Sequence, residues 1–595
     1  MNKTMKKYII FLIAFCLTAV SCNEMLDLEA DGRTSLDKIF SERNGITGYL
    51  NSCYGYCPAP YMDRASLTDE AQDADDLTAG SKFAVWYSDG VTASNYASYS
   101  ADGGPWAGLY QGIRNCNVFL ERIGSVDRSV TGISANEIAG WSAQAHTLRA
   151  LYYLQLAKRY GAVPVLAGTY ATDHDYSGDR REPFSAVVKQ IVADCDAALE
   201  TSVEAFGWGV PTNSFGVMTR AVPYAIKSQA ATYAASPLWA DGTYDWDDAL
   251  DISKEALGTL LANDYKLFDV VPQEDIAQNP YALYFITSSD DQRSVDKETI
   301  YQCGAQMEVW RNAGLPTTSG MLKSGPCPTQ ELVDAYEMED GSTPITGYTN
   351  NGLKPIVNTA SGYIEEGYTN KAEDGRWPSG VRNMYVGREP RFYASINFPG
   401  QIWKQNHELA FWYEGVDGKK YAGSDYCKTG YLMRKINNID ITSNPLKTEK
   451  TFWIYFRLGE IYLNYAEALN EYSGPVDAVY DAVYEVRKRA GLPRLPEGLS
   501  KEQMRERIKH ERRIELAFET HRFFDLRRWK DAEKSEGKPI HSLNIYAGTS
   551  RQDNAFYERT LCEQRVFVAP QHYFFPIEQA EIDKNRDRLL QNPGW

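Results

Sequence analysis

Apolar positions in residues 134–160 recur at steps of three and four, which is the spacing of an amphipathic helix. The repeating positions are Ile138, Trp141, Ala145, Leu148 and Tyr152. Ser134 and Glu137 have capping-box spacing at the start, while Gly161 and Pro164 can end the helix. The spacing therefore predicts one long helix with a buried stripe.

A second column of small side chains in the same segment predicts close helix packing on another face. Ala143, Ala150 and Ala157 follow at seven-residue steps, so a neighbouring helix can approach closely. Similar patterns predict helix pairs at residues 37–56 with 105–123, 134–160 with 183–199, 219–238 with 246–261, and 456–472 with 475–489. Pairs of this size resemble tetratricopeptide units. We predict a mainly α fold, a tetratricopeptide-like helix-pair superhelix.

Two stretches interrupt this helical pattern. Residues 262–450 are rich in Gly, Pro, Asn and Thr, which predicts a loop-rich insertion containing short strands. Residues 57–104 form a loop that is too long for a simple connection. We divide the chain into a signal peptide (residues 1–21), a lipidated tether (22–36), a helical body (37–261), the insertion (262–450) and a C-terminal helical region (451–595).

The N-terminus has the order of a secretory signal. Three lysines precede the apolar run 8–19, which is too short to span a bilayer. Residues 17–22, LTAVSC, look like a bacterial lipobox, which would make Cys22 a lipid-modified first residue of the mature chain. The acidic run that follows is similar to the tether of surface-exposed lipoproteins in Bacteroidetes. We expect a lipid-anchored protein on the extracellular side of the outer membrane.

The overall charge and the missing motifs exclude several functions. A net charge of −17 argues against a nucleic acid as partner. We find no HExxH, P-loop, G-x-S-x-G or G-x-G-x-x-G motif, so we predict neither an enzyme nor a cofactor or catalytic metal. Calcium remains an alternative at a run of carboxylates that lacks EF-hand order, namely Asp69, Glu70, Asp73, Asp75 and Asp76.

Seven segments along the chain carry a family resemblance: WAGLYQGIRNCNVFLERI from Trp106, LRALYYLQLAKRYGAVPVL from Leu148, PTQELVDAYEMEDG from Pro328, GREPRFYA from Gly387, RLGEIYLNYAEALNE from Arg457, ERRIELAFETHRFFDLRRW from Glu511 and FFPIEQAEIDKNRDRLLQNPGW from Phe574. In this order they resemble the SusD/RagB family of outer-membrane nutrient-binding lipoproteins. The resemblance implies four tetratricopeptide-like pairs, a glycan-binding face and a SusC-type TonB-dependent transporter as partner.

The 40 tyrosines and 13 tryptophans provide rings for sugar contacts, although core packing is the commoner use of such residues. Aromatic rings on loops can cover the C–H face of a sugar, while neighbouring polar side chains bind its hydroxyls. The candidate carbohydrate-binding residues are Asp69, Trp86, Tyr87, Asn95, Tyr284, Tyr301, Trp310, Arg311 and Trp412. We predict capture of an oligosaccharide. Binding of peptides or glycopeptides is the alternative, and a glycoside hydrolase is a remote one.

The charged run 511–528 mixes glutamates and an aspartate with five arginines. Opposite charges at steps of three and four predict ion-pair ladders along helices. We prefer this structural interpretation to a catalytic one.

Overall fold

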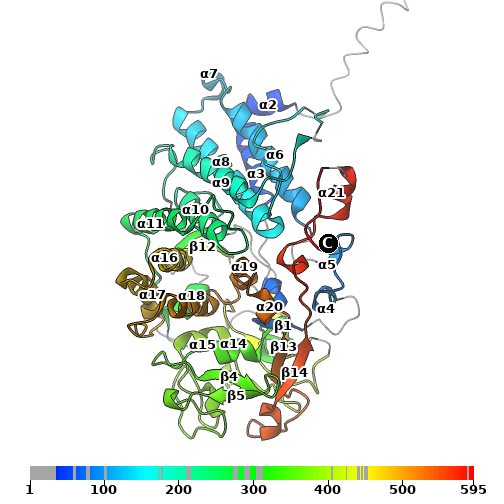
Figure 1. Cartoon of the computed structure of the whole chain (residues 1–595), viewed down its shortest axis with the longest axis vertical. Helices are drawn as coiled ribbons and strands as arrows, with labels where there is room; N and C mark the ends of the chain where they lie inside the picture. Colours follow the sequence, from blue (N-terminus) through cyan, green and yellow to red (C-terminus); the bar gives the residue numbers. More distant parts are fainter. Residues whose placement is uncertain are drawn as a thin grey trace, which may run out of the picture.

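The computed structural model describes residues 35–57, 62–74, 81–99, 104–171, 173–175, 178–209, 216–271, 279–286, 295–302, 313–403, 407–423, 425–437, 442–443, 446–447, 453–585 and 588–595. Helices dominate one end of the molecule, and loops with short strands make up the other (Figure 1).

The predicted helix pairs are present, and the members of each pair contact one another. They are α3 (Arg43–Tyr54) with α6 (Trp106–Ile123), α8 (Ala135–Tyr160) with α9 (Phe184–Leu199), α10 (Ala221–Ala235) with α11 (Trp246–Ala262), and α16 (Leu458–Ser473) with α17 (Asp477–Arg489). Consecutive pairs also touch, through α9 with α10 and α11 with α16. The mainly α, tetratricopeptide-like superhelix is therefore confirmed.

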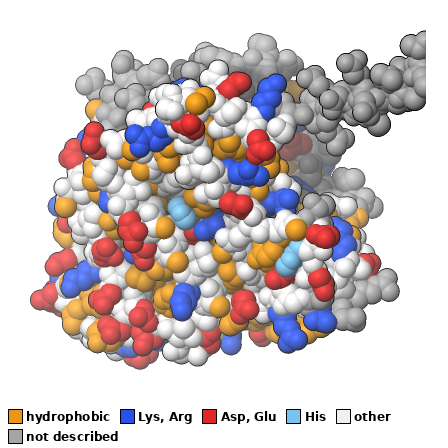
Figure 2. All heavy atoms as spheres, turned by 90° about the horizontal axis from the view of Figure 1, so that it is seen from above, with side chains coloured by type: hydrophobic (Ala, Val, Ile, Leu, Met, Phe, Trp, Pro, Cys, Tyr) orange, Lys and Arg blue, Asp and Glu red, His pale blue; other side chains and the backbone are white. Residues whose placement is uncertain are grey.

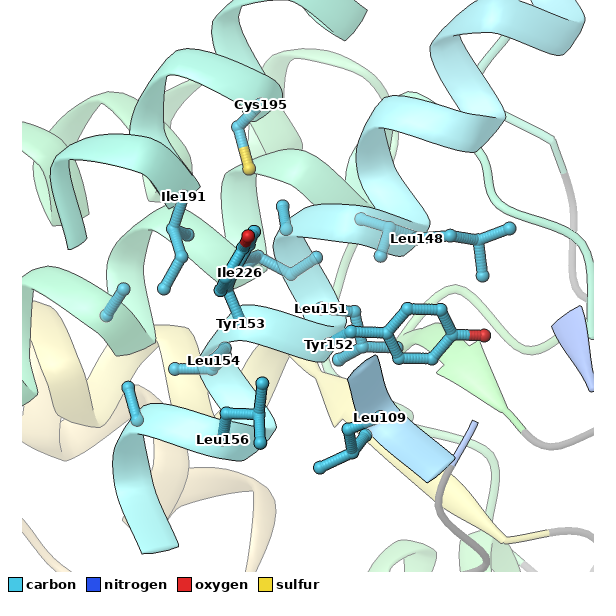
Figure 3. Packing of buried hydrophobic residues seen from close by; sticks show 14 of the residues in the cluster. Leu109, Leu148, Leu151, Tyr152, Tyr153, Leu154, Leu156, Ile191, Cys195 and Ile226 are labelled. Carbon is cyan, nitrogen blue, oxygen red and sulfur yellow. The ribbon is translucent and has the colours of Figure 1, made fainter. Parts of the chain in front are cut away.

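Helix α8 lies at the centre of this array. Its capping box between Ser134 and Glu137 is formed, and Gly161 follows the last turn with φ of 72°. From Leu148 onward almost every side chain is buried, because α6, α9 and α10 pack around the helix. Figure 3 shows side chains of α8 on several sides of the helix, with Tyr153 near Ile191 and Ile226 and Tyr152 pointing the other way. A helix buried on several faces fixes the positions of the pairs on either side of it.

The insertion contains short helices and two-stranded antiparallel ribbons, as its loop-rich composition predicted. Its helices are α12 (Pro280–Ile286), α14 (Gln330–Ala335) and α15 (Pro390–Ser395). Its strands are β2 (Thr299–Gln302), β3 (Pro326–Pro328), β4 (Ile345–Thr349), β5 (Lys354–Val357), β6 (Ile396–Asn397), β7 (Ile402–Trp403), β8 (His407–Glu408), β9 (Leu432–Met433), β10 (Thr442–Ser443) and β11 (Leu446–Lys447). Aromatic and aliphatic side chains from these elements form a second hydrophobic core.

The remaining helices and strands lie outside the four pairs and the insertion. They are α2 (Leu36–Phe40), β1 (Ala71–Asp73), α4 (Lys82–Tyr87), α5 (Tyr96–Tyr99), α7 (Arg128–Thr131), β12 (Ile454–Arg457), α18 (Lys501–Glu515), α19 (His521–Arg528), α20 (Ala532–Ser535), β13 (Pro539–Leu543), β14 (Arg559–Gln564) and α21 (Gln579–Lys584). The C-terminal region, expected to be helical, thus also contains the β13–β14 hairpin, which packs beside α14 of the insertion. The final residues return to the N-terminal helices, where Phe575 N donates to Arg159 O at 2.9 Å (Figure 1).

The charged run 511–528 pairs differently from the predicted ladders. Asp525 and Arg528 do form a pair within one turn, at 2.7 Å. Most partners, however, come from distant segments: Glu511 and Glu515 bind Arg391 of α15, and Glu515 and Glu519 bind Arg457 of β12. The ladder prediction was wrong for these charges because the helices are buried between the two ends of the molecule. They form a buried ionic network that joins the helical body to the insertion.

Charged side chains of both signs are interspersed with hydrophobic ones on the outer face of the helical end (Figure 2). Among the described residues on that face, no extended basic surface is visible.

Candidate functional site

The described part of the long loop 57–104 is bound firmly to the body. Strand β1 pairs antiparallel with β3 of the insertion, with Gln72 opposite Cys327. The Arg565 guanidinium donates to Ala71 O and to Gln72 Oε1, both at 2.7 Å. The loop and the insertion are thus held side by side, although more than 200 residues separate them in sequence.

Asp69 lies just before β1 and is clamped by two arginines. Arg522 binds both carboxylate oxygens, at 2.9 Å each, and Arg513 binds Oδ2 at 2.9 Å. Burial alone would raise the pKa of Asp69, but the positive charges of Arg513 and Arg522 outweigh it and hold the pKa well below its usual range. Asp69 was predicted to contact sugar. In the structure it anchors the loop, because both carboxylate oxygens accept hydrogen bonds from the two guanidinium groups.

Glu70, the next residue, is buried without a hydrogen-bond partner for its carboxyl group among the described residues. Its side chain is 1% exposed, and neither carboxylate oxygen has a hydrogen-bond partner among the described residues. Burial raises its pKa to about 8, against 4.5 for an unperturbed glutamate, with the nearby arginines opposing the shift. The carboxyl group is therefore mainly protonated at neutral pH.

This burial leads to a pH-dependent prediction. Below about pH 4.5 Glu70 is neutral in both the folded and unfolded states, so burial costs no ionisation energy. Between about pH 4.5 and pH 8 the unfolded chain releases the proton and the folded chain keeps it, so stability falls as pH rises. At about 1.4 kcal/mol per pH unit, the loss approaches about 3 kcal/mol at pH 7. Glu70→Gln should remove this loss, because the amide stays neutral.

Chemical denaturation of both proteins from pH 4 to pH 8 measures the effect. The variant should match the parent near pH 4 and exceed it increasingly toward pH 8. Glu204→Gln, at an exposed glutamate, is the matched control and should leave the pH profile of the parent unchanged. A stability difference for Glu70→Gln that is constant across the range would contradict the assignment.

Described residues of the long loop and of the insertion contact one another at two points, Cys57 with Tyr301 and Ala74 with Gly325, and we call these positions, with Ala313 and Ser324, the loop junction. Cys57 Sγ lies 3.6 Å from Tyr301 OH. On the other side, Ala74 N donates to Gly325 O at 2.9 Å and Gly314 N to Ser324 O at 3.1 Å. These contacts join described residues of the long loop to described residues of the insertion.

The two aromatic residues predicted for the long loop lie in the core. Trp86 is 8% exposed, and its ring packs against His572 and Phe575 while Nε1 donates to Tyr99 O at 3.0 Å. Tyr87 is also buried, and its hydroxyl donates to Ser66 O at 2.8 Å. The expectation that these rings face solvent was wrong, because the C-terminal segment covers them. Stacking on a sugar would first require them to be uncovered.

Three other predicted rings are buried as well. Tyr284 packs beside Phe268 and Phe285, Tyr301 beside Tyr455, and Trp412 beside Phe556. Asn95 is half-buried, and its side chain bonds the backbone of Thr92 and Gly90 within its own turn. Of these, Tyr301 alone belongs to the loop junction. Trp310, Arg311 and the anchor Cys22 lie outside the described residues.

No group of three or more His, Cys, Asp or Glu is arranged to hold a metal ion within the part of the chain that the structure describes. The calcium alternative involved Asp75 and Asp76, which lie outside it. Helices in the same described ranges include none that is long and apolar enough to cross a membrane.

Comparison with known proteins identifies the architecture. A model of the SusD family matches residues 284–595, just over half of the chain. A second model, described as starch-binding and associating with the outer membrane, matches residues 26–205. The chain belongs to the SusD family. Its resemblance to that family is thus confirmed, and the family description indicates association with the outer membrane.

Relatives of this SusD-family protein match it over almost its full length. SusD-like protein P2 of Formosa agariphila is 23% identical over 99% of this chain and 100% of its own. A SusD-like protein of Bacteroides fragilis has a TM-score of 0.73 at 25% identity, covering 94% of this chain and 99% of its own. A second B. fragilis structure, described as a SusD-like carbohydrate-binding protein, has a TM-score of 0.70 at 20% identity, covering 92% and 99%. These neighbours are described as SusD-like or binding proteins, and none of the three as an enzyme.

Proposed function

We propose that this protein is a cell-surface lipoprotein that captures an oligosaccharide and passes it to a SusC-type TonB-dependent transporter. Membership of the SusD family is the observation that carries the proposal. The loop junction supports it, because described residues of the long loop contact described residues of the insertion there. Aromatic rings and polar groups at such a place could cover a sugar ring and bind its hydroxyls.

Capture requires no covalent step, so the bound glycan should be released unchanged. Calorimetric titration of the mature chain with a panel of oligosaccharides and peptides tests the proposal. We expect saturable binding of at least one oligosaccharide, and chromatography of the mixture should recover it intact. Binding of peptides with no response to any oligosaccharide would favour the peptide-binding alternative. Hydrolysis of the glycan would favour an enzyme.

The membrane anchor is proposed from the lipobox-like sequence that ends at Cys22. Acyl chains contribute about 0.8 kcal/mol for each buried CH₂ group, which makes two chains a stable anchor. Cys22→Ala should therefore give a folded protein that no longer sediments with outer membranes. Cys562→Ala, which changes a cysteine far along the chain, should still sediment. Retention of Cys22→Ala in membranes of cells without the transporter would contradict the anchor.

The transporter partnership is proposed on the same family membership. A lipid anchor confines the protein to the membrane surface and so raises its effective concentration near the barrel. A modest interface would then suffice to hold it over the extracellular opening. Affinity purification of the protein in mild detergent should recover a TonB-dependent transporter. Recovery of the protein alone, under conditions that preserve related complexes, would argue against the partnership.

A further inference from the structure

A groove separate from the loop junction lies between α6, the described residues 164–171, 173–175 and 178–179, and α21 with the described residues that follow it. Its volume is about 810 Å³, and its lining includes Tyr110, Arg114, Asn117, Tyr170 and Lys584. Pockets that hold small organic ligands typically have volumes of roughly 300 to 1,000 Å³. The C-terminal helix α21 closes one side of the groove, next to helices from the opposite end of the sequence (Figure 1).

One wall of the groove is rigidly positioned. Tyr110 OH donates to Pro164 O at 2.8 Å, and Asn117 Nδ2 donates to Leu166 O and Gly168 O, each at 2.8 Å. Asn117 is itself held by Arg149, a buried residue whose guanidinium also binds Asp194. The backbone opposite α6 is therefore fixed before any ligand arrives, which lowers the entropic cost of binding.

The lining combines aromatic rings with both basic and acidic hydrogen-bonding side chains. Tyr110 is half-buried and is backed by Trp106, with ring centres 5.1 Å apart, while Tyr170 and His174 lie 4.4 Å apart on the other side. The lining contains three basic side chains, Arg114, Lys584 and Arg588, and three acidic ones, Asp175, Asp179 and Glu581. This balance does not favour a strongly charged ligand. Rings together with donors and acceptors fit a neutral, polyhydroxylated molecule.

Arg114 is the clearest polar group available to such a ligand. Its side chain is exposed, and in the described part of the chain it makes no hydrogen bond or ion pair. It lies one helical turn beyond Tyr110, so both side chains face the same side of α6. By contrast, a side chain at Gly112 would meet the rings of Tyr152 and the Cβ of Tyr56, next to the loop junction. The groove and the junction thus lie on different sides of this helix.

We infer that the groove is a second binding site for a short neutral oligosaccharide, distinct from the loop junction. This inference rests on the proposed function, since it assigns the same class of ligand to another surface. A protein with two sites would hold separate parts of one long glycan, and each site could then be individually weak.

Calorimetry and hydrogen exchange on the mature chain test the groove, using malto-, xylo- and fructo-oligosaccharides as probes. The parent should bind a probe at two sites per chain, with slower exchange in residues 104–117. Tyr170→Ala should weaken one site by about tenfold or more, because a stacked ring contributes roughly 1 to 3 kcal/mol by analogy with bases on aromatic side chains. Arg114→Ala should weaken the same site, and its exposed, unpaired position makes a folding defect unexpected. Tyr472→Ala, at an exposed tyrosine of α16, is the matched control.

The outcomes separate this inference from the proposed function. Loss of one site in both variants, with two sites kept in Tyr472→Ala, would support the groove. A parent that binds a probe at one site, unchanged in both variants and without protection of residues 104–117, would overturn the groove and leave the proposed function intact. If no oligosaccharide binds the parent at all, the proposed function fails and this inference fails with it.

Discussion

Replacing Arg457 with methionine should lower the free energy of unfolding by about 3 to 5 kcal/mol, the range measured when one partner of a buried ion pair is removed. Arg457 is 2% exposed, and its guanidinium binds Glu298, Glu515 and Glu519 at 2.7 to 2.9 Å. At Glu519 burial alone would raise the pKa, but the charge of Arg457 is the main counterweight and the pKa is about 2. Without Arg457, three buried carboxylates lose a shared cation.

Urea denaturation of the parent and the variant would measure this loss. In the variant Arg489 would still pair with Glu298 and Glu515, and Lys435 with Glu519. These remaining cations limit the loss of stability. Arg122→Met is the matched control, because Arg122 pairs with Asp37 at 2.9 Å on an exposed surface. Exposed pairs contribute about 0 to 1 kcal/mol, so this control should stay close to the parent. Equal losses in the two variants would show that the buried network has no special role.

The helical fold was predictable because its signals are local. The capping residues Ser134 and Glu137, the stripe through Leu148 and Tyr152, and the terminating Gly161 all lie within one segment, and each acts on its own helix. The charged run 511–528, in the last turn of α18 and in α19, predicted its ion pairs less reliably. The spacing of its charges fits pairs within one helix. Glu515 instead forms ion pairs with Arg457 and Arg391, because tertiary packing buries α18 between the two ends of the molecule. Sequence spacing contains no information about that burial.

The candidate site was harder to predict for the same reason. Trp86 and Tyr87 lie in a loop with many polar residues, which is typical of a surface. Their burial depends on His572 and Phe575, nearly 500 positions later in the chain. The groove residues Tyr110 and Arg114 were not among the predicted binding residues, because they lie in a helix with no aromatic-rich loop around them. Only the fold shows that Pro164 and α21 complete a groove there.

The burial of Trp86 leads to the second large expected effect. Trp86→Ala should lower the free energy of unfolding by about 3 to 5 kcal/mol, as large-to-small substitutions of buried aromatic residues do. The substitution removes the ring contacts to His572 and Phe575 and leaves Tyr99 O without its indole donor. It should also loosen the contact between the long loop and the C-terminal segment, because the ring lies between them.

Melting temperature and glycan affinity should be measured on the same variant, since the two interpretations of Trp86 differ in both. A core residue produces a large fall in melting temperature, with affinity changing only as the folded fraction falls. A solvent-facing platform residue would produce the reverse, an unchanged melting temperature and binding weakened by about tenfold or more. Tyr546→Ala, at a tyrosine that is 62% exposed, is the aromatic control and should change stability by no more than about 0.5 kcal/mol. Because Trp86 is 8% exposed and its indole nitrogen is already paired, we expect the first result.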